Sequence, residues 1–243
     1  MRLTVLGCGD AFGSGGRLHT CFHVASEGTG FLVDCGASAL IAMRRFGVDP
    51  NGIDTVFLTH LHGDHFGGLP WLILDGQLVS RRTKPLTIVG PPGLRERLPA
   101  AMEVLFPGSS TVERTFPVMV REIEAGAPET FGGVALTAFA VEHPSGAPSH
   151  ALRLAHAGKV LTYTGDTQWV EALVPAGASA DLMIAEGYTV ERPVKFHLSW
   201  AMLKARLPEI APKRLMLTHM SPEMLAHTPD GYIAAEDGLV LEI

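Results

Sequence analysis

The sequence has few of the features that mark membrane, secreted or disordered proteins. It holds no apolar run near the roughly 18 residues that a membrane helix needs, and its start, MRLTVLGCGD, lacks the basic residues and long apolar core of a signal peptide. Only three of its 243 residues are cysteines (Cys8, Cys21, Cys35). Their odd number and wide spacing fit neither a metal knuckle nor a disulfide framework. We therefore predict a cytoplasmic protein whose cysteines are reduced and buried.

An excess of basic residues is also lacking. The formal net charge is −6 at pH 7, which gives no general attraction for DNA or a long RNA. We interpret the one tight basic cluster, Arg81, Arg82 and Lys84, as a surface loop. A hydrophobic content of 47% excludes disorder. Because the sequence shows neither a fixed repeat nor a low-complexity linker, we predict one domain over residues 1–243.

Short apolar runs rich in β-branched residues recur along the whole chain and predict strands. These runs are residues 3–6, 21–25, 31–33, 55–58, 86–89, 134–141, 160–164, 182–185 and 215–218. Helical spacing occurs between them, at residues 38–46, 69–78, 94–106, 169–174 and 199–207. The early strands cluster without helices between them, which excludes an alternating barrel or a doubly wound sheet. The pattern predicts a layered α+β sandwich.

Four residues of metal-binding type lie within six positions in the segment THLHGDH (59–65), directly after a strand of buried type. His60 and His62 are two apart, so in an extended segment they point to the same side and can bind one cation. Gly63 permits a turn, after which Asp64 and His65 face a second position close by. Imidazole and carboxylate ligands suit zinc, with iron or manganese as alternatives. A polar, solvated turn is the other interpretation of this segment.

Three later apolar runs also end on a possible ligand, namely His143, Asp166 and His219. Taken singly, each has an ordinary structural role as an equal alternative. Taken with the first segment, they complete two groups of ligands. The first group is His60, His62 and His143, the second is Asp64, His65 and His219, and Asp166 bridges them. Two ions about 3.5–4 Å apart can share a hydroxide and hold the attacking and leaving oxygens of a displacement.

The segment 59–65, with YTGDT around Asp166 and LTHMS around His219, resembles the metallo-β-lactamase superfamily over nearly the whole chain. The resemblance implies a four-layer αββα sandwich with a dinuclear site along one edge of the sheets. It implies two divalent cations, zinc first and manganese or iron as alternatives, and a homodimer. FLVDCG (31–36) resembles an early strand of that superfamily, which implies that Asp34 orients a metal-bound histidine.

Within the superfamily, the opening residues, YTGDT and residues 185–207 resemble the ribonuclease Z-like and small phosphodiesterase branch. Asp166 stands where many true β-lactamases have a cysteine, which disfavours that activity. The branch implies that His197, paired with Glu186, protonates the leaving oxygen and that Asp64 orients the attacking hydroxide. A carboxylate beside an imidazole raises the imidazole pKa, which suits a general acid. The alternative for His197 is a structural residue at a helix N-terminus.

We therefore predict a dinuclear metal-dependent hydrolase in which a metal-bridging hydroxide cleaves a small phosphodiester, such as a cyclic nucleotide. Only 20 residues separate Asp166 from Glu186, too few for the long arm with which ribonuclease Z grips tRNA. The acidic balance also disfavours a long nucleic acid. Two alternatives stay open: the same metal centre acting on a lactone, a thioester or an aryl sulfate ester, and a metal-binding protein without catalysis.

The glycine-rich start (Gly7, Gly9, Gly13, Gly15, Gly16) resembles a dinucleotide-binding loop only superficially, because strand-like residues follow it where that motif needs a helix. We interpret it as a loop at the rim of the metal cleft. The remaining polar candidates are His19, His23, His150, Ser145 and Ser149. They either line the substrate pocket or have structural roles, and their spacing does not decide between the two.

Overall fold

The computed structural model describes residues 1–227 and 229–243, which fold into two mixed β-sheets of seven strands each. The strands of the first sheet, in spatial order, are β14 (Val240–Glu242), β1 (Arg2–Gly7), β2 (Cys21–Ser26), β3 (Thr29–Val33), β4 (Thr55–Phe57), β5 (Leu86–Gly90) and β6 (Val118–Glu122). Those of the second sheet are β13 (Ile233–Ala234), β12 (Leu215–Thr218), β11 (Leu182–Glu186), β10 (Lys159–Tyr163), β9 (Ser149–His156), β8 (Val134–Val141) and β7 (Glu129–Phe131).

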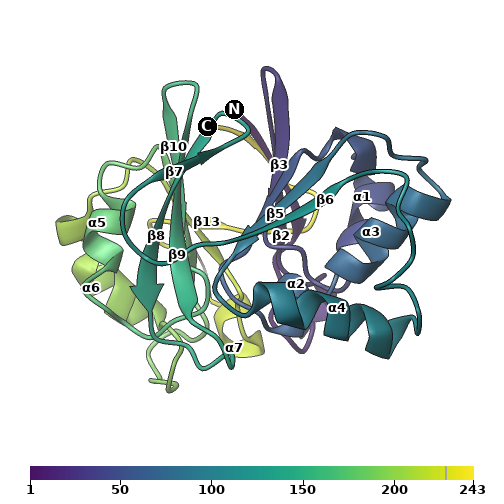
Figure 1. Ribbon diagram of the computed structural model, residues 1–243. Coiled ribbons are helices and arrows are strands. Elements are labelled where there is room, and N and C mark those ends of the chain that lie inside the picture. Colours follow the sequence, from purple (N-terminus) through teal and green to yellow (C-terminus); the bar gives the residue numbers. More distant parts are fainter. Residues whose placement is uncertain (228) are drawn as a thin grey trace.

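Helices cover the outer faces of the two sheets, so the molecule has four layers (Figure 1). The helices beside the first sheet are α1 (Ala39–Phe46), α2 (Gly63–Phe66), α3 (Leu69–Leu78) and α4 (Leu94–Leu105). Those beside the second sheet are α5 (Leu173–Gly177) and α6 (Trp200–Ile210), and the short α7 (Pro222–Leu225) follows β12. This arrangement confirms the predicted αββα sandwich.

The strands are buried on both faces, which explains why the sequence shows continuous apolar runs rather than alternation. In β4, Phe57 packs in the core between the sheets, whereas Val56 packs in the core beneath α1, α3 and α4. In β11, Ile184 belongs to the core between the sheets and Met183 packs with Trp200 of α6. A one-residue slip would exchange these faces, so the register of the strands is strongly determined.

The ends of several strands meet at one edge of the sandwich. The strands β10, β11 and β12 are parallel, and Asp166, Glu186 and His219 lie at or just after their carboxyl ends. β9 is antiparallel to both β8 and β10, so β8 runs in the same direction as β10 and delivers His143 to the same edge. His60 follows β4 in the first sheet. The topology therefore brings together residues that are far apart in the sequence.

Most predicted elements are confirmed to within two residues at either end, with three differences. The helix predicted at residues 169–174 is wrong: α5 spans Leu173–Gly177, which places Pro175 in the first turn, where its missing N–H costs no hydrogen bond within the helix. α6 continues three residues beyond the predicted end, to Ile210, and Ser199 caps its start by accepting a hydrogen bond from the Met202 N–H.

The third difference is a set of strands that the sequence did not reveal, namely β6, β7, β9, β13 and β14. The longest of these, β9, carries Arg153 among its apolar residues, and its guanidinium binds the carbonyl oxygens of Ala176 and Ala178. The cysteines are free and buried, as predicted. In the described part of the chain, none of the helices has the length and apolar character that a membrane span requires.

The basic cluster at residues 81–84 lies in the loop between α3 and β5, but its members differ. Arg81 and Lys84 are exposed, whereas the Arg82 side chain is buried. Its guanidinium donates hydrogen bonds to the carbonyl oxygens of Pro50, Ile53, Lys84 and Pro85. The surface interpretation is therefore wrong for Arg82, which holds two loops together.

Candidate metal centre

The segment 59–65 leaves β4 and turns directly into the one-turn helix α2. His62 keeps an extended conformation (φ −76°, ψ 154°) and precedes the first helical residue, Gly63. Asp64 and His65 lie within that turn and are buried. Gly68 then precedes α3, as the sequence predicts for the glycine pair. The extended stretch and the turn that follows it therefore place His60 and His62 at one position and Asp64 and His65 at a neighbouring one.

The structure brings all seven predicted ligands together in two groups. In the first group, ligand atoms of His60, His62 and His143 lie within 4.8 Å of one another. The Nε2 atom of His143 is 3.0 Å from Nδ1 of His62. The Nδ1–H of His143 donates to the carbonyl oxygen of Phe196 at 3.2 Å, which leaves Nε2 as the acceptor. Two imidazole lone pairs that converge at this distance suit a shared cation.

The second group contains Asp64, His65, Asp166 and His219, all of them buried. His65 Nε2 lies 3.3 Å from both Asp64 Oδ2 and Asp166 Oδ1. His219 Nε2 lies 3.3 Å from Asp64 Oδ2 and 3.1 Å from Asp166 Oδ2. Asp166 Oδ2 is also 3.8 Å from His143 Nε2 in the first group. Asp166 therefore lies between the groups, where the sequence placed the bridging residue.

A hydrogen-bond network fixes the histidines of the first segment. The buried Asp34 carboxylate accepts a hydrogen bond from His65 Nδ1 at 2.6 Å, from the Thr59 N–H at 2.8 Å and from the Thr59 hydroxyl at 2.8 Å. The Thr59 oxygen in turn lies 3.0 Å from His60 Nδ1 and accepts its proton. Both rings consequently direct Nε2 into the site, the arrangement that orients histidine ligands in metalloproteins.

Several polar atoms in the site have no hydrogen-bond partner although they are buried. They include Nε2 of His60, Nε2 of His65 and Oδ1 of Asp166. An unpartnered buried polar group is costly, and a divalent cation among these atoms would satisfy them. The donor set, with its imidazole nitrogens and carboxylate oxygens, also suits zinc and related ions. The residues therefore fit a metal site.

The charges of the second group fit the same conclusion. Burial alone would raise the pKa of Asp64, but the neighbouring His65 and His219 outweigh it and hold the pKa below its usual range. Burial likewise disfavours the charged form of His219, yet Asp166 and Asp64 raise its pKa to about 10. Protons on the histidines thus balance the carboxylates when no cation does so. A bound metal would displace these protons, which couples metal affinity to pH.

Glu186 and His197 form the predicted pair. The buried Glu186 carboxylate accepts a hydrogen bond from His197 Nδ1, and its other oxygen accepts from the N–H groups of Thr167 at 3.0 Å and Leu198 at 3.2 Å. Burial lowers the pKa of His197, but the bond to Glu186 and its charge have the larger combined effect, so the pKa is raised. The Tyr188 ring lies 4.8 Å from the His197 ring, centre to centre. Geometry also allows Asp166, Glu186, His197 and His219 to share a cation.

Three of the seven non-glycine residues with positive φ angles in the described part of the chain lie at the site. Asp34, Phe196 and His219 have positive φ angles of 58°, 67° and 56°, a conformation that costs free energy for residues other than glycine. Each strained residue serves the site directly: Asp34 binds His65, the Phe196 carbonyl binds His143, and His219 faces Asp64. The surrounding structure holds these residues in place against the strain.

The candidates whose roles stayed open are now placed. His19 lines a hollow of about 430 Å³ beside Asp64, together with Trp71 and Leu105. His23 lines a different hollow with Arg2, and His150 is buried. The glycine-rich loop contains a short 3-10 turn, Ser14–Gly16, and leads into β2 rather than into a helix, as predicted.

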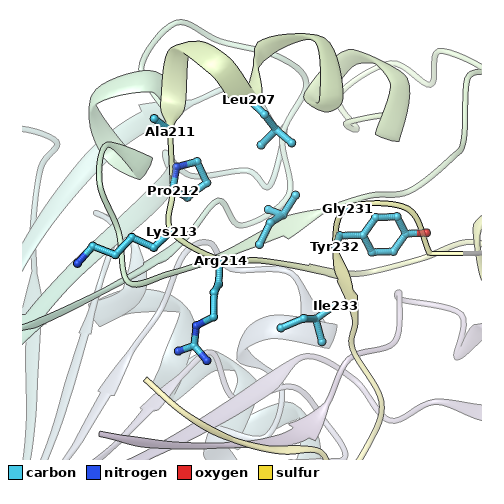
Figure 2. A pocket seen from close by; sticks show the side chains of 9 residues that line it. Leu207, Ala211, Pro212, Lys213, Arg214, Gly231, Tyr232 and Ile233 are labelled. Carbon is cyan, nitrogen blue, oxygen red and sulfur yellow. The ribbon is translucent and has the colours of Figure 1, made fainter.

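A further hollow of about 500 Å³ lies between the end of α6 and the segment around Tyr232 (Figure 2). Its lining includes Lys213 and Arg214, but their charged ends already bind Asp181 and the carbonyl oxygen of Glu242. It shares no lining residue with the two ligand groups. It is therefore separate from the metal centre.

Sequence reasoning missed three residues that act on the ligands: Thr59, Phe196 and Arg97. The Arg97 guanidinium donates to the carbonyl oxygens of Leu61 and Ser145, on either side of the first group. Thr59 stands directly before the first histidine and was detectable as a hydrogen-bonding neighbour. Phe196 and Arg97 act through backbone carbonyls, which no residue pattern reveals.

Comparisons with known proteins agree with this site. A family model described as "Anti-Pycsar protein Apyc1" matches residues 1–235. A ribonuclease Z of Agathobacter rectalis is 28% identical over 86% of this chain and 84% of its own. The crystal structure of the short form of human tRNase Z (ELAC1) has a TM-score of 0.83 at 28% identity, covering 100% of this chain and 99% of that one. A diphosphatase of the PhnP family, at 18% identity and a TM-score of 0.80 over 100% of this chain and 97% of its own, shows the same fold.

The fold, the donor groups and these relatives define a metal-dependent hydrolase of the metallo-β-lactamase fold that acts on phosphoester bonds. The match to the family model spans nearly the whole chain. The chain belongs to the Apyc1 family.

Proposed function

We propose that this protein hydrolyses a small phosphodiester, such as a cyclic nucleotide, with two zinc ions. The observation that carries the proposal is the position of Asp166, which contacts both donor groups while the Glu186–His197 pair lies against the second. Two adjacent cation positions with a proton donor beside them match the needs of a displacement at phosphorus.

We assign one ion to His60, His62 and His143, the other to Asp64, His65 and His219, and a bridging position to Asp166. Bound there, divalent cations lower the pKa of water and withdraw charge from phosphoryl oxygens. Zinc fits the imidazole-rich donor set best, with manganese or iron as alternatives. Asp64, which faces His65 and His219 through one carboxylate oxygen, orients the attacking group through the same carboxylate.

His197 is the proton donor to the leaving oxygen in this mechanism. Its Nδ1 is held by Glu186, so Nε2 is the nitrogen that delivers the proton. The carboxylate stabilises the imidazolium form of His197, and the two backbone N–H groups that bind Glu186 hold that carboxylate in place. An alkoxide leaves slowly unless it is protonated, so this donor matters most for poor leaving groups.

Three observations support a small substrate. The segment between β10 and β11 contains only the one-turn helix α5, so no long arm projects from it. The hollow beside Asp64 is largely apolar and contains the ring of Trp71, which offers a stacking surface for a base. The negative net charge also gives no broad attraction for a polyanion.

RNA is the second candidate substrate, and the names of the relatives favour it. The curated relatives are called ribonuclease Z, and the human structure is a tRNase Z. The two candidates share the metal centre and the bond that is cleaved. They differ in the surface that must hold the rest of the substrate, so they are distinguished by turnover of a cyclic nucleotide and of a precursor tRNA under identical conditions.

The first experiment is hydrolysis of bis(p-nitrophenyl) phosphate by zinc- or manganese-loaded protein. A chelator-treated sample and the corresponding monoester serve as controls. Metal-dependent cleavage that favours the diester supports the proposal. Absence of turnover in a sample that contains two metal ions per chain would direct attention to the other predicted substrates, a lactone, a thioester or an aryl sulfate ester.

The homodimer and the cytoplasmic location stay predictions. Free, buried cysteines suit a reducing compartment. Exposed apolar side chains on or next to α3 and α4 include Leu78, Val79 and Val104, so that face is the first to examine for self-association. Light scattering of the protein and of a Val104→Glu variant after size-exclusion chromatography measures whether a dimer forms there.

A further inference from the structure

Arg97 binds both of the chain segments that carry the first ligand group. It projects from α4 and is half-buried. Its Nη1 donates to the carbonyl oxygen of Leu61 at 3.3 Å and to that of Ser145 at 2.8 Å, and its Nη2 donates to that of Gly146 at 3.1 Å. Leu61 lies between His60 and His62, and Ser145 follows His143 by two residues. We call these three contacts the Arg97 clamp.

The clamp joins parts of the molecule that come from different sheets. His62 follows β4 of the first sheet, whereas His143 follows β8 of the second. Their ring nitrogens must stay about as close as the 3.0 Å seen here for both to reach one cation. A backbone hydrogen bond from the His150 N–H to the Thr59 carbonyl, at 2.9 Å, joins the two segments at one point, and the Arg97 clamp joins them at a second.

Both ends of the clamp are rigid. The start of α4 is fixed by Glu122, whose carboxylate accepts hydrogen bonds from the N–H groups of Gly93 and Arg95. The loop after His143 is closed on itself, because the Ser149 hydroxyl donates to the His143 carbonyl at 2.8 Å and lies 3.2 Å from the Ser145 hydroxyl. Because the guanidinium is planar and rigid and both segments are ordered, its hydrogen bonds fix the position of one segment relative to the other.

The glycine at position 146 is needed for the same contact. Its φ angle is +71°, and a Cβ atom built there would lie 3.0 Å from Arg97 Nη2. A methyl group at this position would require the guanidinium to shift by a few tenths of an ångström, and the positive φ angle would strain the loop that carries the Gly146 carbonyl. Gly146 therefore provides a way to disturb the clamp without removing the arginine.

We infer that Arg97 is a positioning residue that sets the separation of His62 and His143, and thereby the metal affinity of the group His60, His62 and His143. The inference rests on the proposed function, since it takes that group as a metal site. Lysine cannot replace arginine here, because a single ammonium group does not present parallel N–H donors to three carbonyl oxygens. Residues that orient metal ligands through hydrogen bonds change metal affinity by about 10- to 100-fold when they are replaced.

The test measures metal affinity directly by competition with a chromophoric chelator, with total metal content determined by mass spectrometry. Wild-type protein is compared with Arg97→Ala, Arg97→Lys and Gly146→Ala. Arg95→Ala is the matched control, because Arg95 lies on the same helix and carries the same charge but binds Glu122 and the Val120 carbonyl. We expect Arg97→Ala to weaken one of the two ions about 10- to 100-fold, Arg97→Lys and Gly146→Ala to weaken the same ion, and Arg95→Ala to match the wild type.

Cobalt substitution identifies which ion is affected, since a position with three imidazoles and one shared carboxylate and a position with two imidazoles and two carboxylates give different absorption spectra. Equal affinities in Arg97→Ala and wild type overturn the inference. Equal weakening of both ions, together with a lower melting temperature of the metal-free variant, also overturns it, because it shows a general structural role. If the wild type itself binds fewer than two ions, the proposed two-ion function fails, and the inference about Arg97 fails with it unless the remaining ion is the one that Arg97→Ala weakens.

Discussion

The two sheets contribute to the metal centre in different ways. The first sheet supplies four candidate ligands from one continuous segment, residues 59–65, held by Asp34 and Thr59. The second sheet supplies its ligands singly, from the ends of separate strands. The first contribution is encoded locally, so a motif reveals it. The second is created by strand order, and each of its residues looks ordinary in the sequence.

The difference also concerns what holds each contribution in place. In the first segment, a one-turn helix and one buried carboxylate orient the histidines. In the second sheet, the ligands are oriented by the strand register and by single contacts such as the one from His143 to the Phe196 carbonyl. Asp166 contacts His65, which follows a strand of the first sheet, and His219, which follows a strand of the second, so it links the residues from the two sheets.

The largest expected effect comes from replacing Asp166, which lies between the two donor groups. In Asp166→Ala both donor groups lose a shared oxygen ligand, so we expect both ions to be lost and activity to fall to that of the metal-free protein. Metal content and turnover of bis(p-nitrophenyl) phosphate measure this. Asp181→Asn, which alters an ion pair of the second sheet with Lys213, is the control. Retention of two ions in Asp166→Ala would mean that the two sheets bind metal independently.

The second effect concerns His197, the proposed proton donor, which Glu186 of the second sheet binds. We expect His197→Ala to lower turnover about 10²- to 10⁴-fold for a diester with an alkoxide leaving group, with little change for p-nitrophenolate, which leaves without protonation. Glu186→Gln should show the same selectivity more weakly. Rates with the two kinds of leaving group, at equal metal content, measure it. An equal loss for both kinds would argue for a structural role of His197.

The third effect examines the first segment alone. Asp34→Asn introduces an N–H donor where Thr59 and His65 both donate, so the orientation of His65 is disturbed. We expect the affinity for the ion held by His65 to fall about 10- to 100-fold, while the other ion is less affected. Chelator competition measures both affinities, with Asp54→Asn, directly before β4, as a control. Equal weakening of both ions would show that Asp34 supports the whole centre.

The smallest expected effect concerns His23 in β2, which belongs to neither donor group. Burial and, to a lesser extent, Arg2 lower its pKa below the ordinary value of 6.5. The unfolded chain therefore binds more protons at this position, so the free energy of unfolding decreases as the pH falls below 6.5. The contribution is complete above that pH. Denaturant unfolding between pH 5 and 8 should show a weaker pH dependence for His23→Gln than for the wild type, and an identical dependence would contradict this assignment.

Particular residues show which parts of the fold and of the site could be predicted from the sequence. The predicted fold class is confirmed because doubly buried strands give continuous apolar runs that stand out in a sequence. His60, His62, Asp64 and His65 were recognisable from their spacing alone. The helix at residues 169–174 was misplaced because Trp169 and Val170 pack against the second sheet without forming a helix. The strand β9 was not predicted because His150, Arg153 and His156 interrupt its apolar residues in the sequence.

The sequence by itself determined the local part of this protein: a strand that runs into a dense set of imidazole and carboxylate groups, and a chain able to bury two sheets. The bridging place of Asp166 and the pairing of Glu186 with His197 were already expected, but only the tertiary structure decided the distances within these sets and the contact of Arg97 with both sides of the first group. These relations depend on the direction and order of strands far apart in the chain, and on contacts to backbone carbonyls. Neither leaves a pattern that can be read from side chains in one dimension.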